Sequence, residues 1–200
     1  MRSRLLVLIV AAILVVSCKS TEQAPATAAT VEITTTIGSI VVLINHSAAP
    51  ITSANFMRYV DESRFDSAQF YRTVTVDNQP NNQILIEVIQ GGLGSAGSNR
   101  LAAISHETTR DTGLRHLDGT ISMARSEPGS ASSEFFICIG DQPELDFGGL
   151  RNPDGQGFAV FGQVISGMEV VQSIHASPRN GQSLTPPIEI VSVRRLQPEF

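Results

Sequence analysis

The stretch Phe70-Tyr71-Arg72 sets a single arginine among aromatic and β-branched residues, a pattern typical of a β-strand. Such a strand holds one guanidinium in a fixed direction on an otherwise apolar surface. Two later segments, Ile89–Gly92 and Ser133–Cys138, are also strand-like; the first contains Gln-Gly-Gly, and the second places two phenylalanines on opposite faces. Together the three segments predict an apolar pocket with one cation and a few amides, but without a nucleophile, a metal cluster or a general base. Such a site fits a reaction that makes and breaks no covalent bond.

The N-terminus has a different character from the rest of the chain. Arg2 and Arg4 precede an unbroken apolar run, Leu5–Val16, that is too short to span a bilayer as a helix. A basic start followed by a short apolar run is typical of a secretory signal peptide. We therefore expect residues 1–17 to be a signal peptide.

The end of the apolar run indicates a lipid anchor. Val15-Val16-Ser17-Cys18 resembles a bacterial lipobox, in which the cysteine is lipidated and becomes the mature N-terminus. Ordinary signal cleavage beside an incidental cysteine is the alternative. Lys19 stands where Asp would retain a lipoprotein in the inner membrane, so we expect an outer-membrane location facing the periplasm. The small, polar composition that follows predicts a lipidated cysteine with a flexible tether over residues 18–30 and one folded domain over residues 31–200.

Charge and cysteine content exclude several classes of function. The formal net charge of −5 argues against a surface for nucleic acid or anionic lipid, so we expect membrane contact through the lipid alone. Cys138 lies in an apolar run and has no partner if Cys18 is lipidated, which predicts a buried, unreactive thiol. The 4 histidines lack metal-ligand spacing. We predict no metal, no cofactor and a monomeric protein.

The periodicity of apolar residues predicts a mainly β structure. Strands are expected at Val31–Thr36, Ile40–Ile44, Gln69–Val74, Ile84–Gln90, Gly119–Ala124, Glu134–Ile139, Ala159–Val164 and Ile188–Leu196. Helical spacing predicts two helices, at about residues 50–60 and 168–174. Many short strands with turn-rich connections and two helices indicate a closed antiparallel barrel with helical caps.

With these elements in order, the chain resembles the cyclophilins, which are peptidyl-prolyl cis–trans isomerases, from about Val31 to Leu196. The motifs that carry the resemblance are Ala49–Thr52 with Asn55-Phe56, Phe65-Asp66, Phe70–Arg72, Ile89–Gly92, Gly119–Ala124, Ser133–Ile137, Leu145-Asp146 and Val160–Val164. The resemblance implies an eight-stranded barrel capped by two α-helices, with a site for proline-containing polypeptides on its outer face. It also implies catalysis without a cofactor.

The implied reaction is rotation about an X–Pro amide bond, which faces a barrier of about 18–20 kcal/mol. As the bond twists, the proline nitrogen regains a lone pair, and a hydrogen-bonding cation stabilises the twisted state more than the planar one. Arg72 matches the catalytic arginine of the family. Gln90 matches a residue that positions the arginine and the substrate backbone, and Phe136, the third expected catalytic residue, walls the proline ring.

Six further positions are expected to contact the substrate. Val88 and Leu145 match positions that wall the proline ring, and Ala124 stands where a small residue lets the peptide approach closely. Glu134, Phe158 and Tyr71 complete the predicted substrate contacts. Without the resemblance, Phe136, Leu145 and Val88 would be taken for ordinary core residues.

The sequence also departs from the family pattern. Residues 77–82 form a polar insertion between Arg72 and Gln90, and the nearest residue to a family phenylalanine is Ile86 or Glu87. Glutamate replaces a tryptophan at Glu144, which predicts weak cyclosporin binding, and phenylalanine replaces a histidine at Phe158.

Glu134 stands where the family has a glutamine beside the substrate backbone. A carboxylate at about 4 Å from Arg72 would attract it by about 4 kcal/mol at an effective dielectric near 20. We therefore expect Glu134 either to orient Arg72 or to compete with the substrate for it; a solvated carboxylate at the rim is the alternative.

The predicted function is peptidyl-prolyl isomerisation in exported proteins, assisting their folding in the cell envelope. Two other functions stay open at this point. One is a catalytically weak proline-binding module or chaperone on the same fold, and the other is a lipocalin-like carrier with a ligand inside the barrel. Large apolar side chains expected in the barrel interior oppose the carrier.

Overall fold

The computed structural model describes residues 28–94 and 99–197. The predicted signal peptide and Cys18 lie outside these residues. None of the helices found in the described ranges combines the length and hydropathy needed to cross a bilayer.

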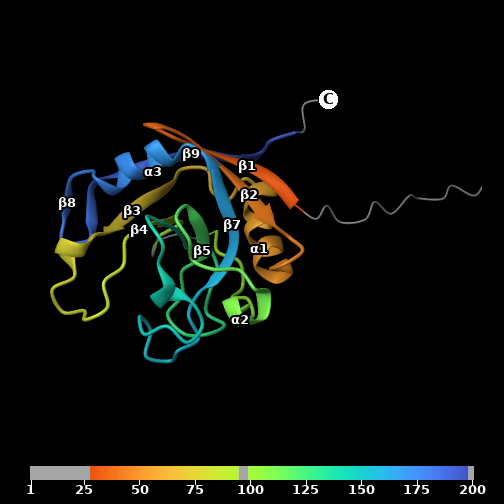
Figure 1. Cartoon of the computed structure of the whole chain (residues 1–200). Coiled ribbons are helices and arrows are strands. Elements are labelled where there is room, and N and C mark those ends of the chain that lie inside the picture. Colours follow the sequence, from red (N-terminus) through yellow and green to blue (C-terminus); the bar gives the residue numbers. More distant parts are fainter. Residues whose placement is uncertain (1–27, 95–98, 198–200) are drawn as a thin grey trace, which may run out of the picture.

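Antiparallel strands build the fold, with helices packed against them (Figure 1). The elements are β1 (Ala28–Thr35), β2 (Gly38–Asn45), α1 (Pro50–Asp61), β3 (Ala68–Val74), η1 (Val76–Asn78), β4 (Val88–Gly92), α2 (Thr109–Thr112), β5 (Thr120–Met123), β6 (Phe135–Cys138), η2 (Pro143–Leu145), β7 (Ala159–Ser166), α3 (Met168–His175), β8 (Arg179–Asn180) and β9 (Ser183–Arg195).

The strands close into a barrel. They pair in the order β1-β2-β7-β5-β6-β4-β3-β9, and β1 also pairs with β9, which joins the two ends of the sheet. The two-residue strand β8 pairs only with β9 and forms a short hairpin beside the barrel. The predicted closed eight-stranded antiparallel barrel is therefore confirmed.

Strand alternation divides the apolar residues between the barrel interior and a smaller cluster on its outer face. In β6, Phe135 is fully buried in the interior, whereas its neighbour Phe136 belongs to the outer cluster. Aromatic rings fill the interior, with Phe135 packed edge-on against Phe56 and Phe70 at centroid distances of 5.6 and 5.7 Å. A barrel filled in this way leaves no room for the ligand of a lipocalin-like carrier.

Helices α1 and α3 pack against different parts of the barrel (Figure 1). Helix α1 begins with Pro50 at its first turn, and the Glu107 carboxylate accepts hydrogen bonds from the backbone N–H groups of Ile51 and Thr52 at 3.1 and 2.7 Å. Glu107 thereby satisfies amides that a helix N-terminus leaves unpaired and ties the long loop before β5 to α1. The short helix α2 in that loop was not expected, so the described residues contain three α-helices where two were predicted.

Three predicted boundaries are wrong. Strand β1 begins at Ala28 because residues 28–30 pair with β2, so they are not part of a tether. Strand β4 begins at Val88, four residues later than predicted, because the buried Gln79 carboxamide binds both backbone groups of Ile86 at 2.8 and 3.3 Å and takes the place of a sheet partner. Strand β9 begins at Ser183, five residues earlier than predicted, since it also pairs with β8.

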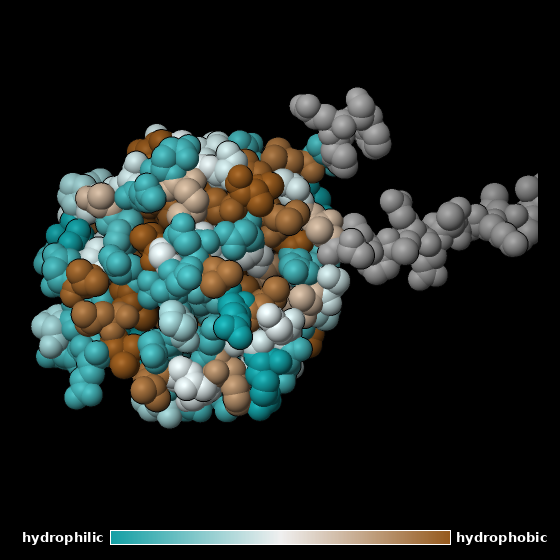
Figure 2. Space-filling model, in the orientation of Figure 1, coloured by the Kyte–Doolittle hydropathy of each residue, from teal (hydrophilic) through white to brown (hydrophobic). Residues whose placement is uncertain are grey.

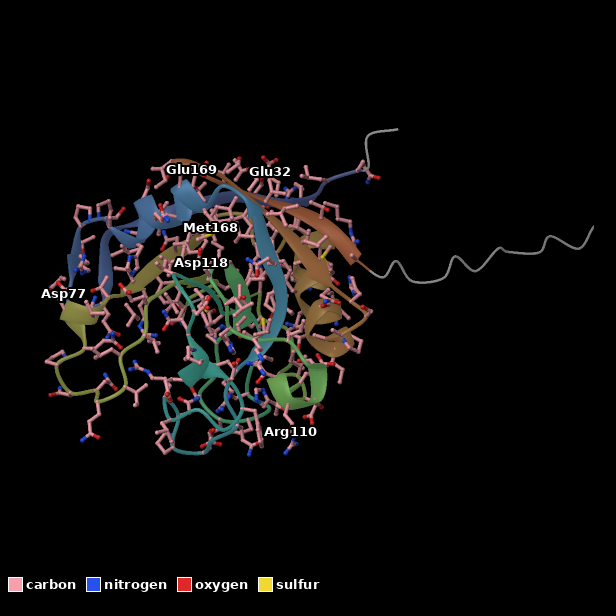
Figure 3. All side chains as sticks on the ribbon, in the orientation of Figure 1. Glu32, Asp77, Arg110, Asp118, Met168 and Glu169 are labelled. Atoms are coloured by element: carbon pink, nitrogen blue, oxygen red, sulfur yellow. The ribbon has the colours of Figure 1, made fainter. Side chains whose placement is uncertain are left out.

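The surface shows mixed polarity. On the face in Figure 2, polar and apolar residues alternate over short distances. Ion pairs join exposed elements, as where Asp77 of η1, at the β8 end of the molecule in Figure 3, accepts hydrogen bonds from Arg179 at 2.9 Å.

Candidate functional site

The centre of the candidate site is the guanidinium of Arg72 on β3. Its Nη1 donates a hydrogen bond to Oε1 of Gln90 on β4 at 2.6 Å. Its Nε and Nη2 both donate to Oε1 of Gln182, in the turn between β8 and β9, at 3.0 and 2.6 Å. Burial lowers the pKa of Arg72, but an arginine stays protonated at any physiological pH. The predicted role of Gln90 in positioning Arg72 agrees with this geometry, whereas Gln182 was missed.

Both hydrogen-bond acceptors of Arg72 are neutral amides. They fix the direction of the guanidinium without cancelling its charge, as a carboxylate would. Three of the five N–H groups of Arg72 are used in this way, so one N–H on each Nη atom remains for a ligand.

The expected direct contact between Glu134 and Arg72 is absent among the described residues. Instead the hydroxyl of Tyr71 donates to Oε2 of Glu134 at 2.6 Å and accepts from Nε2 of Gln90 at 2.8 Å. Burial, followed by the Glu134 carboxylate, raises the pKa of Tyr71, so the phenol keeps its proton. Glu134 is therefore linked to Arg72 through the hydrogen bonds of Tyr71 and Gln90, because the tyrosine hydroxyl lies between Glu134 and Gln90.

The position of Glu134 depends on a glycine and an arginine. Gly92 has φ +139°, and a Cβ there would lie 2.6 Å from the backbone oxygen of Ser133 and 2.7 Å from Oε2 of Glu134, so a larger residue would displace this segment. On its other side Glu134 pairs with Arg100 at 3.1 Å and accepts a hydrogen bond from Ser133 at 2.8 Å.

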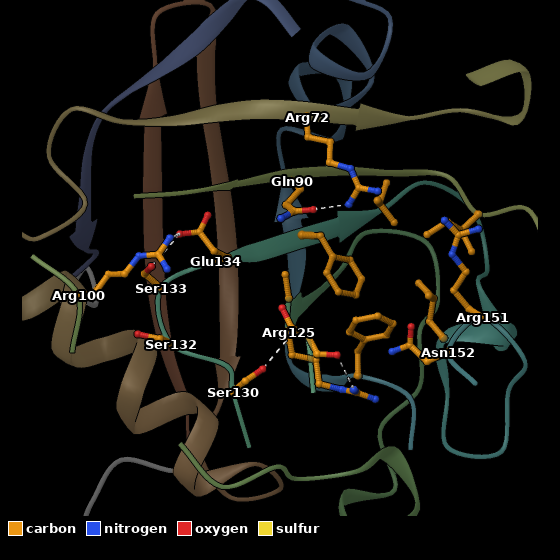
Figure 4. A pocket seen from close by; sticks show the side chains of 17 residues that line it. Arg72, Gln90, Arg100, Arg125, Ser130, Ser132, Ser133, Glu134, Arg151 and Asn152 are labelled. Carbon is orange, nitrogen blue, oxygen red and sulfur yellow. Dashed lines mark hydrogen bonds and ion pairs between the residues drawn. The ribbon is translucent and has the colours of Figure 1, made fainter. Parts of the chain in front are cut away.

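A cavity of about 370 Å³ opens beside Arg72 on the outer face of the barrel (Figure 4). Its apolar wall is formed by Phe136 and Phe158, whose rings meet edge-on at 5.3 Å, with Leu145, Val88 and Ile86. Ile86 lines the cavity, whereas Glu87 does not, which settles the position that the sequence left open.

Most of the predicted site residues line this cavity. They are Arg72, Gln90, Phe136, Val88, Ala124, Glu134, Leu145 and Phe158. Tyr71 is the exception: its hydroxyl is taken up by Gln90 and Glu134, so it supports the lining and is not part of it. Glu144 is not part of the lining either, because its carboxylate turns to the backbone N–H of Leu150 at 2.8 Å.

His116 supports the pocket from behind. Its ring lies parallel to Phe136 at a centroid distance of 5.8 Å, and its two nitrogens contact Asp146 at 2.7 Å and Ser122 at 3.0 Å. Burial lowers the pKa of His116 although Asp146 acts in the opposite direction. The sequence showed this histidine only as one of four scattered ones, since nothing local indicates its contact with Phe136.

Arg125 holds the loop that carries Phe158. Its guanidinium binds both carboxylate oxygens of Asp154, at 2.7 and 2.9 Å, and the backbone oxygen of Gly157, and it lies 5.2 Å from the centre of the Phe158 ring. Arg125 holds the pKa of Asp154 near 2. Among the described residues, no group of three or more His, Cys, Asp or Glu is arranged to hold a metal ion. Cys138 is a buried free thiol, as expected, and burial raises its pKa.

Comparisons with known proteins identify the family of this chain. The family model for cyclophilin type peptidyl-prolyl cis-trans isomerases matches residues 30–195. The chain is 36% identical over 149 residues to the peptidyl-prolyl cis-trans isomerase cyp18 of Streptomyces antibioticus, covering 72% of this chain and 82% of that one. It is 36% identical over 159 residues to peptidyl-prolyl cis-trans isomerase A of Dickeya dadantii, covering 77% of each.

The fold has solved counterparts. A cyclophilin type peptidyl-prolyl cis-trans isomerase of Cryptosporidium parvum superposes with a TM-score of 0.69 at 19% identity, covering 86% of this chain and 99% of that one. With the closed barrel, the outer apolar pocket and the matched motifs, the chain belongs to the cyclophilin-type peptidyl-prolyl cis-trans isomerases.

Proposed function

We propose that this protein accelerates rotation about X–Pro bonds of exported polypeptides and so assists their folding in the cell envelope. The single observation that carries the catalytic part is the Arg72 guanidinium, held by Gln90 and Gln182 at the edge of an apolar pocket. A proline ring fits such a pocket because it is apolar and compact. The adjoining amide then lies beside a cation that is already oriented.

The mechanism follows from the difference between the planar and twisted amide. In the planar state the nitrogen lone pair is delocalised into the carbonyl and accepts hydrogen bonds poorly. In the twisted state it is localised, so an N–H of Arg72 binds it more strongly and lowers the barrier. Because Gln90 and Gln182 fix the guanidinium beforehand, little reorganisation is needed when the bond turns.

The remaining pocket residues position the substrate. Phe136, Val88 and Leu145 enclose the ring, and Ala124 leaves space for the peptide backbone. None of these steps needs a nucleophile or a proton transfer, and the cavity lining includes neither histidine nor cysteine among the described residues.

The test is the relaxation of a short Ala-Pro peptide from cis to trans, followed without a coupled protease, with the full chain purified in detergent. We expect acceleration that Arg72→Ala abolishes while the peptide still binds. An unaccelerated reaction with intact peptide binding would replace this function by that of a proline-binding module.

The envelope location rests on the N-terminal sequence. Cys18 follows a short apolar run and small residues, so in this proposal it carries the lipid, and Lys19 directs the protein to the outer membrane with the domain in the periplasm. The test is metabolic labelling with a palmitate analogue in a bacterial host, followed by membrane fractionation. Labelling that survives Cys18→Ser would refute the anchor, and recovery in the inner-membrane fraction would refute the outer-membrane location.

A further inference from the structure

The charge of the pocket is not balanced. The cationic residues that line it are Arg72, Arg100, Arg125 and Arg151, and the one acidic residue of that lining, within the described ranges, is Glu134. Arg100 pairs with Glu134 at 3.1 Å, and Arg125 pairs with Asp154 at 2.7 Å. Arg72 and Arg151 take part in none of the ion pairs found over residues 28–94 and 99–197. Two cations therefore remain uncompensated at one cavity of a chain whose formal net charge is −5.

Arg151 is held in place at the pocket edge. Its Nη1 donates to the backbone oxygen of Ile84 at 2.5 Å, and its backbone N–H donates to the oxygen of Glu144 at 3.2 Å. The Glu144 carboxylate accepts from the N–H of Leu150, which fixes the same turn. Figure 4 shows Arg151 and Asn152 on one side of the cavity, with Arg100 on the opposite side.

The two cations act on each other. Burial and the charge of Arg72 lower the pKa of Arg151, although it remains protonated. Like charges at a partly desolvated site raise the free energy of the empty pocket, and an anion bound between or beside them relieves that repulsion. Arg151 uses one of its five N–H groups on Ile84, which leaves four for a ligand, and the planar guanidinium suits a carboxylate with two parallel hydrogen bonds.

We propose that Arg151, at the pocket edge and apart from the catalytic Arg72, forms a subsite for a substrate carboxylate, so that this protein favours X–Pro bonds with aspartate or glutamate next to the proline. The inference rests on the proposed isomerase function, because the proline ring must occupy the apolar pocket for the neighbouring side chain to reach Arg151. Arg151 is then a specificity-determining residue. It stands beside Glu144, which occupies the position of a tryptophan in the family pattern.

The test compares matched peptides. Each pair has Glu or Gln at one position, either directly before or directly after the proline, and kcat/KM is measured by NMR exchange with the full chain in detergent. A charged hydrogen-bonded pair contributes enough to predict about a tenfold preference for the Glu peptide at one of the two positions. Arg151→Gln should bring that ratio close to one. Arg58→Gln, the same charge change on α1 outside the pocket lining, should leave the ratio as in the unchanged protein.

Two outcomes would overturn the subsite: ratios near one at both positions in the unchanged protein, or a preference that Arg151→Gln leaves intact. A salt titration of the unchanged protein is a second readout that needs no variant, since the preference should fall as salt screens the pair. If not even the Gln peptides are accelerated, the proposed isomerase function has failed instead. Calorimetric binding of the Glu and Gln peptides then still decides whether the subsite exists.

Discussion

The neutral partners of Arg72 lead to a prediction about charge: Gln182→Glu will lower kcat. Oε1 of Gln182 accepts hydrogen bonds from Nε and Nη2 of Arg72 at 3.0 and 2.6 Å. A glutamate side chain has the same length and offers an oxygen at the same place, so both hydrogen bonds can form again. The substitution adds a full negative charge beside the guanidinium. It also replaces the Nε2 donor to the backbone oxygen of Asn78, at 3.1 Å, by a second oxygen.

The expected size follows from the charges. Two unit charges at about 4 Å attract each other by about 4 kcal/mol at an effective dielectric near 20. The added carboxylate attracts the guanidinium and partly neutralises its charge. The guanidinium then binds the proline nitrogen of the twisted state less strongly, and the barrier rises. A loss of about one third of that energy from the twisted state, roughly 1.4 kcal/mol, corresponds to about a tenfold fall in kcat.

The assay compares three variants by NMR exchange on a neutral Ala-Pro peptide. Gln182→Ala frees the Arg72 side chain, at a cost of about 0.5–1.5 kcal/mol, and should lose about two- to tenfold in kcat. Gln182→Glu should lose about tenfold or more in kcat, with a small fall in the unfolding midpoint because the hydrogen bond to the backbone oxygen of Asn78 is lost. Gln172→Glu, an exposed position on α3, controls for the change in net charge. If Gln182→Glu folds normally and keeps the original kcat, the charge of Arg72 is not what stabilises the twisted amide.

Three further predictions concern the supports of the pocket. Phe136→Ala removes a ring that packs against Phe158 and His116. Urea unfolding should show that the free energy of unfolding falls by about 3–5 kcal/mol, and a fall below about 1 kcal/mol would contradict this packing. Tyr71→Phe removes the hydroxyl that joins Gln90 to Glu134. It should lower kcat about two- to fivefold at constant KM, since one net hydrogen bond contributes about 1 kcal/mol. An unchanged kcat would exclude this indirect role of Glu134. Because burial lowers the pKa of His116, the unfolded chain binds a proton at this histidine more tightly than the folded chain does. The contribution of neutral His116 to the free energy of unfolding is therefore complete above the ordinary pKa of 6.5, and it is lost as the pH falls through the lower pKa of the folded state. Urea unfolding between about pH 5 and 7.5 checks this, and a slope that His116→Gln leaves unchanged would contradict it.

Local sequence pattern was sufficient where the structure follows the period of a strand. The neighbours Phe135 and Phe136 fall on opposite faces of β6, one in the barrel interior and one in the pocket, as their alternation predicts. Arg72 was identified from its aromatic context, and family motifs added Gln90, Leu145 and Phe158, which all line the cavity.

The residues that were missed depend on contacts between distant segments. Gln182 is 110 positions from Arg72 in the chain, and the two meet only because β9 pairs with β3. Arg151 reaches the cavity through a loop whose course is set by Glu144 and Ile84. Glu134 was expected to act on Arg72 directly, from its place in the family pattern and its charge, but this reasoning did not include the hydroxyl of Tyr71, which takes up the carboxylate.

The two supports of the aromatic wall differ in their tolerance of acid. Arg125 holds the pKa of Asp154 near 2, so the ion pair that fixes the loop of Phe158 persists in mild acid. His116, behind Phe136, instead gains a proton more readily once the chain has opened. Mild acid should therefore lower the free energy of unfolding through His116, while the ion pair between Arg125 and Asp154 stays formed; of the two supports, only His116 makes the stability of the pocket wall depend on pH in this range.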